Sequence, residues 1–156
     1  MDCILLKQDY DIKKLIYDFN KAESYHSFIN PENISEKSFS LSNKTYGWEA
    51  IPLHTIDGKI GNESTIPVDI TNKEFKPNIV LQKCDYFREI LNDLDTEIYL
   101  VRIMKLKAGG YIAPHKDTVL QNNVIRCNLP IISNPDVNLY MDNVKYYLEP
   151  GKLYFI

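Results

Sequence analysis

The chain has 156 residues, of which 44% are apolar and 25% charged, and its formal net charge is −3. These values indicate one soluble globular domain, 1–156, and exclude an intrinsically disordered chain. The small, mixed charge argues against a nucleic-acid partner, and the absence of any long apolar run argues against a membrane partner. The three cysteines, Cys3, Cys84 and Cys127, are odd in number and far apart, which favours a reducing cytoplasm over a disulfide framework.

The first hundred residues predict two helices and one strand. Apolar residues recur at helical spacing over 11–22 and again over 85–94. Between them, 24–44 is polar and reads as loop, whereas 48–55 is apolar enough for a strand. Asp57-Gly58 then offers a tight turn.

After Thr96 the pattern changes to short strands. Residues 97–106 alternate with both faces largely apolar, which predicts a strand enclosed between two layers. Ala108-Gly109-Gly110 predicts a turn, and 111–114 the start of the next strand. Further strands are predicted at 124–132, 137–141, 144–148 and 152–156, with Asp142-Asn143 as a two-residue hairpin turn. This rhythm is typical of a sandwich or barrel, so we divide the domain into a helical and loop part, 1–46, and a strand-rich core, 47–156.

His115-Lys116-Asp117 is the candidate metal motif. His-X-Asp forms two of the three ligands in the two-histidine, one-carboxylate sites that hold non-haem Fe(II). In an extended segment, side chains two residues apart point the same way, so both groups can reach one ion. The alternative is a surface loop with a solvated histidine and aspartate.

Other segments carry motifs around this pair. In chain order they are GWEAIPLHTIDG, CDYFREIL, VRIMKLKAGGYIAPHKD, IRCNLPIISNPDVNLYMDN and LEPGKLYFI. Together they resemble the aspartyl/asparaginyl β-hydroxylase family of Fe(II)/2-oxoglutarate dioxygenases, and within it the branch similar to proline cis-4-hydroxylase. The resemblance implies a double-stranded β-helix, a cupin-like jelly roll, preceded by N-terminal helices.

The resemblance also implies roles for individual residues. His115 and Asp117 match the first two iron ligands. Arg126 matches an arginine near the carboxylates of 2-oxoglutarate, where the guanidinium fork can pair bidentately. Asn128 stands beside it, at a position where family members commonly carry a histidine.

Three further residues are candidates for substrate binding. Arg102 lies in the predicted strand before the motif, and it either clamps a carboxylate of substrate or cosubstrate or pairs with an acid in the core. Trp48 and His54 match a segment near the substrate pocket, although a single tryptophan is more often a core residue.

The third iron ligand should be a histidine after 152–156, followed by an arginine for the distal carboxylate of 2-oxoglutarate, and neither is present in the sequence. His26 and His54 lie far upstream of that position. We therefore predict a jelly roll without its C-terminal part, including its last strands. The chain is a truncated enzyme, a short relative that has lost catalysis, or one half of a site completed by a partner chain.

The leading hypothesis is a 2-oxoglutarate-dependent hydroxylase of a free amino acid or an amino-acid side chain, with weak iron binding and little turnover in the chain as it stands. The alternatives are a non-catalytic jelly-roll module that binds a small carboxylate and a structural subunit. Whether the protein forms a homo-oligomer stays open.

Overall fold

The computed structural model describes residues 3–30, 46–61, 64, 69–115, 124–137 and 139–156. In chain order the elements are β1 (Ile4–Lys7), α1 (Ile12–Tyr25), β2 (Tyr46–Ile56), β3 (Phe75–Pro77), the 3-10 helix η3 (Leu81–Lys83), α2 (Asp85–Asn92), β4 (Val101–Tyr111), β5 (Cys127–Asn128), β6 (Leu139–Met141), β7 (Val144–Tyr146) and β8 (Leu153–Phe155). No helix in these described ranges has both the length and the apolar character needed to cross a membrane.

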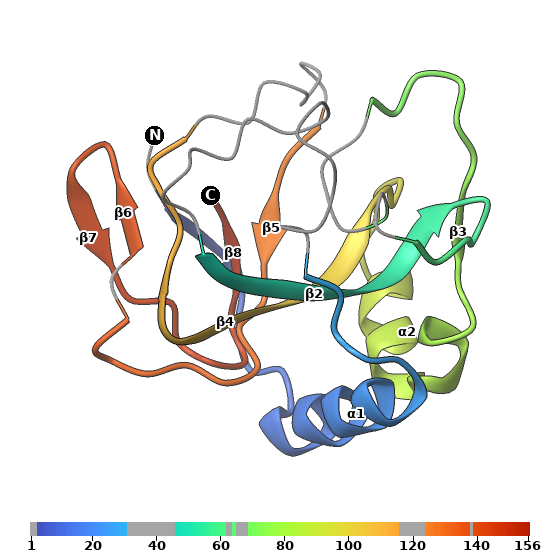
Figure 1. Ribbon diagram of the computed structural model, residues 1–156, viewed down its shortest axis with the longest axis horizontal. Coiled ribbons are helices and arrows are strands. Elements are labelled where there is room, and N and C mark those ends of the chain that lie inside the picture. Colours follow the sequence, from blue (N-terminus) through green and yellow to red (C-terminus); the bar gives the residue numbers. More distant parts are fainter. Residues whose placement is uncertain (1–2, 31–45, 62–63, 65–68, 116–123, 138) are drawn as a thin grey trace.

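The strands form small antiparallel sheets. One sheet has the order β3-β2-β4, a second has the order β1-β8-β5, and β6 and β7 form a separate hairpin. Figure 1 shows β2 crossing the middle of the molecule, with α1 and α2 on one side of it. This arrangement confirms a mainly β fold with two helices, whereas the double-stranded β-helix stays a prediction.

The helices cover one face of the β3-β2-β4 sheet. Leu15 of α1, Ile51 of β2 and Ile103 of β4 belong to one buried cluster. On the same sheet face, the buried Glu49 carboxylate pairs with Lys105 Nζ at 3.4 Å and Lys107 Nζ at 2.7 Å. This face is therefore filled by apolar packing and internal ion pairs.

The opposite face of this sheet is open along β4 but buried along β2, where Trp48 is 8% exposed and Ala50 0%. Side chains alternate along a strand, so the cross-strand pairs Trp48–Leu106, Ala50–Met104 and Pro52–Arg102 point away from the helices. Met104 is 43% exposed and Leu106 41% exposed. The second face of β4 is therefore only partly covered at Met104 and Leu106, because apolar alternation marks two apolar faces without saying how far each is covered.

The boundaries of β4 also differ from the prediction. The strand begins at Val101 rather than residue 97, and it continues to Tyr111 through Ala108-Gly109-Gly110, which is not a turn between two strands. Glycines inside a strand can mark a bulge as well as a turn, and here they form a bulge. Residues 112–114 consequently carry no strand.

Other predicted elements are closer to the structure. The helix expected over 11–22 runs from Ile12 to Tyr25, and the one expected over 85–94 ends at Asn92. Asp142 and Asn143 have φ of 47° and 66°, which confirms the two-residue hairpin turn. Within 124–132 only Cys127–Asn128 is strand, and Pro130 has no N–H with which to extend the pairing.

Candidate functional site

The tautomer of His115 suits a metal ligand. Its Nδ1 lies 2.8 Å from the backbone carbonyl oxygen of Ala113, a residue that is 5% exposed. A carbonyl can only accept a hydrogen bond, so Nδ1 carries the proton and Nε2 carries the lone pair. Metal-binding histidines are commonly oriented in this way, with one ring nitrogen donating to a carbonyl and the other facing the ion.

The second predicted ligand, Asp117, lies outside the described residues, so the structure shows only the histidine of the pair. Within the described residues there is no group of three or more histidine, cysteine, aspartate or glutamate side chains that could hold a metal ion. The described donor set therefore fits one ligand of an iron site, which would bind through Nε2 of His115.

His54 lies at the other end of β2 from the strand segment that leads to His115. Tyr46 pairs with Tyr111, four residues before His115, whereas His54 pairs with Val101. Eight residues of strand correspond to about 26 Å at roughly 3.3 Å per residue. His54 is also engaged locally, because its Nδ1 lies 2.5 Å from the Tyr99 carbonyl oxygen.

Three aromatic rings form a cluster at that end. The rings of His54 and Phe75 are stacked with 10° between their planes, and Phe75 meets Tyr99 edge-to-face at 5.6 Å. All three line a hollow of about 750 Å³ beside β3. The sequence pointed to His54 but missed Phe75 and Tyr99, because Phe75 lies in a stretch with no predicted strand and Tyr99 in a strand with apolar residues on both faces.

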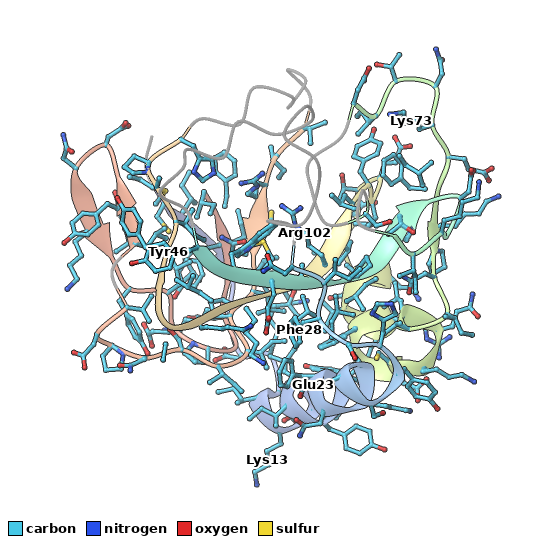
Figure 2. All side chains as sticks on the ribbon, in the orientation of Figure 1. Lys13, Glu23, Phe28, Tyr46, Lys73 and Arg102 are labelled. Carbon is cyan, nitrogen blue, oxygen red and sulfur yellow. The ribbon has the colours of Figure 1, made fainter. Side chains whose placement is uncertain are left out.

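Arg102 and Trp48 come together on the open face of the sheet. The Arg102 guanidinium carbon lies 5.3 Å from the centre of the Trp48 ring, across the small side chain of Ala50. Figure 2 shows Arg102 on the side of β2 opposite to Glu23 and Phe28. The contact is a cation–π interaction, which attracts the guanidinium to the indole ring.

The structure also bears on the alternative for Arg102. The buried acid of β2, Glu49, points to the helical side and pairs with lysines there. Glu49 is therefore not the acid that the core-pairing alternative for Arg102 requires, and both roles of Arg102 stay predictions.

Arg126 and Asn128 share one face of the second sheet. Cys127 pairs with Phe155 and Asn128 with Tyr154, while the Arg126 carbonyl accepts a hydrogen bond from the Ile156 N–H at 3.2 Å. Arg126 comes just before β5 and Asn128 lies in it, a spacing of two that places side chains on one face where the backbone is extended. Both side chains are half-buried, and together they offer donors to one carboxylate.

The buried thiol of Cys84 does not compete with this site. Burial and the nearby Asp18 carboxylate raise the pKa of the Cys84 thiol to about 11. The thiol is therefore protonated at neutral pH, and it is neither a nucleophile nor a ready metal ligand.

Comparison with known families agrees with the order of motifs in the sequence. The sequence model of the aspartyl/asparaginyl β-hydroxylase family matches residues 16–156. The chain belongs to this family. A search of curated proteins found no match. Membership makes this chain part of a hydroxylase family. The matched span contains every candidate site residue named above, and among the helices and strands it leaves out only β1 and the start of α1.

Proposed function

We propose that this family member is an Fe(II)/2-oxoglutarate-dependent hydroxylase of a free amino acid or an amino-acid side chain. The observation that carries the proposal is the His115 imidazole, whose Nδ1 donates to the Ala113 carbonyl, an orientation that is common among histidines that bind a metal through Nε2. The His-X-Asp spacing and the family match support the same function.

The chain's own residues bind and orient in this proposal. His115 and Asp117 hold the iron, which when bound supplies the oxygen chemistry that hydroxylates a C–H bond while 2-oxoglutarate is decarboxylated. The Arg126 guanidinium and the Asn128 amide donate to a 2-oxoglutarate carboxylate. Arg102, whose guanidinium lies near the Trp48 ring, pairs with the substrate carboxylate and so selects a small acid such as an amino acid.

The test is an anaerobic titration of the full-length protein with Fe(II), then 2-oxoglutarate, followed by oxygen and a panel of amino acids. We expect iron binding that His115→Ala removes, and succinate formation that depends on one class of amino acid. If iron, nickel and manganese all fail to bind at the His115 site, the proposal is wrong.

A non-catalytic module that binds a small carboxylate is the second candidate. It is favoured by the two arginines Arg102 and Arg126, because a guanidinium can pair with a small carboxylate without a metal. In that case the affinity for 2-oxoglutarate or an amino acid is the same with and without a metal chelator, and Arg126→Gln lowers this affinity. The hydroxylase instead predicts that the chelator weakens 2-oxoglutarate binding, because the cosubstrate chelates the ion.

A further inference from the structure

We propose that the backbone contact between Gly47 and Gly110 is the device that positions His115. The inference rests on the proposed function, since it concerns the iron ligand of that site. Gly47 and Gly110 are positioning residues, and neither is expected to touch metal, cosubstrate or substrate.

The contact lies in a large bulge between β2 and β4. Trp48 pairs with Leu106, and the next pair along is Tyr46 with Tyr111. Gly47 alone therefore faces the four residues 107–110. Such a bulge bends its strand and redirects the chain that follows.

Only glycine fits at the centre of this bulge. Gly47 has φ of +74°, and a Cβ added there would lie 2.9 Å from the Gly110 Cα. A Cβ on Gly110 would lie 2.9 Å from the Lys107 carbonyl oxygen and 2.7 Å from Leu106 Cδ1. Two of these three atoms belong to the backbone, so a side chain at either position must push the bulged strand away from β2.

The bulge leads directly to the metal motif. On its far side the Tyr46 and Tyr111 rings meet with their centres 6.3 Å apart, which ties Tyr111 to β2. Two residues later Ala113 is buried, and its carbonyl accepts the proton of His115 Nδ1 at 2.8 Å. Because the path from Tyr111 to His115 is short, a shift of the bulge changes where Ala113 and the imidazole lie.

The chain offers a matched control for Gly47→Ala. Gly58 lies just beyond the other end of β2, and its φ of +69° imposes the same backbone strain on an alanine. The closest atom to its added Cβ is the Pro77 carbonyl oxygen, at 3.4 Å. Gly58→Ala therefore reproduces the strain of Gly47→Ala without disturbing the bulge.

Two measurements on the full chain separate positioning from general stability. Long-range ¹⁵N NMR at pH 8 reports which His115 nitrogen is protonated without any metal, and titration with Co²⁺ reports the affinity of the site. Gly47→Ala is expected to abolish the single Nδ1–H tautomer of His115 and to weaken Co²⁺ binding about tenfold or more, as loss of an orienting partner does at other metal sites. Gly58→Ala is expected to leave both readouts as in the wild type.

The possible outcomes are distinct. If Gly47→Ala folds and leaves both the tautomer and the Co²⁺ affinity unchanged, the positioning role is refuted. If the wild type binds no Co²⁺ but Gly47→Ala still changes the tautomer, the proposed function fails and the positioning role stands. If Gly47→Ala does not fold, Gly110→Ala tests the same positioning role. Its added Cβ would crowd Leu106 and Lys107 without backbone strain, because Gly110 does not have a positive φ.

Discussion

Asp18 caps a helix to which it does not belong. Cys84 stands at the N-cap position of α2, and its side chain accepts no capping hydrogen bond from the helix, so the first turn of α2 depends on another acceptor. Asp18 Oδ2, from α1, accepts the Phe87 N–H at 2.9 Å and is 2% exposed. Asp18→Ala leaves that N–H buried without its charged acceptor.

The size of the effect follows from this geometry. Loss of a helix cap costs about 0.5–2 kcal/mol, and a buried hydrogen bond to a charged group contributes about 1.5–3 kcal/mol. We therefore expect Asp18→Ala to lower the free energy of unfolding by about 2 kcal/mol, which is roughly 4–8 °C in Tm for a domain of this size. Asp18→Asn keeps an acceptor oxygen and loses the charge at the helix N-terminus, for a smaller loss of about 0.5–1 kcal/mol.

Urea unfolding followed by far-UV circular dichroism measures both variants. Asp136→Ala, at an exposed position, is the control for removing a carboxylate and is expected to stay within about 0.5 kcal/mol of the wild type. If Asp18→Ala also stays within that margin, the carboxylate does not cap α2 in solution and the reasoning is wrong.

Three further predictions concern the thiols and the two arginines. Because the pKa of the buried Cys84 thiol is raised to about 11, this thiol should resist a disulfide reagent at pH 8 while the exposed Cys127 reacts, and equal rates for the two in the folded protein would contradict this. The contribution of the protonated Cys84 thiol to stability is complete below its ordinary pKa of 9.0 and is lost as the pH rises from there towards 11. Arg102→Lys keeps the charge but loses the stacked fork, and calorimetry should show amino-acid affinity about tenfold weaker with 2-oxoglutarate affinity unchanged. Arg126→Lys should show the reverse pattern, and equal losses for both ligands in either variant would contradict the assignment of separate carboxylates.

Local chemistry in the sequence was enough for several elements. The apolar spacing of 11–22 and 85–94 predicted both helices, because a helix needs one apolar stripe and its signal is contained in a dozen residues. Asp142-Asn143 predicted its hairpin turn, since these residue types tolerate the positive φ that the turn requires. The order of motifs around His115-Lys116-Asp117 likewise predicted the family that the comparison shows.

Tertiary structure decided what those motifs do in space. Ala108-Gly109-Gly110 has the composition of a turn, and it is a bulge in β4 because Gly47, more than fifty residues upstream, packs against it. Arg102 lies on the open sheet face with Trp48, and His54 joins Phe75 and Tyr99 at the far end of β2. A single sequence shows which side chains can share a strand face, whereas strand pairing and register, which depend on contacts between distant residues, decide which of them meet.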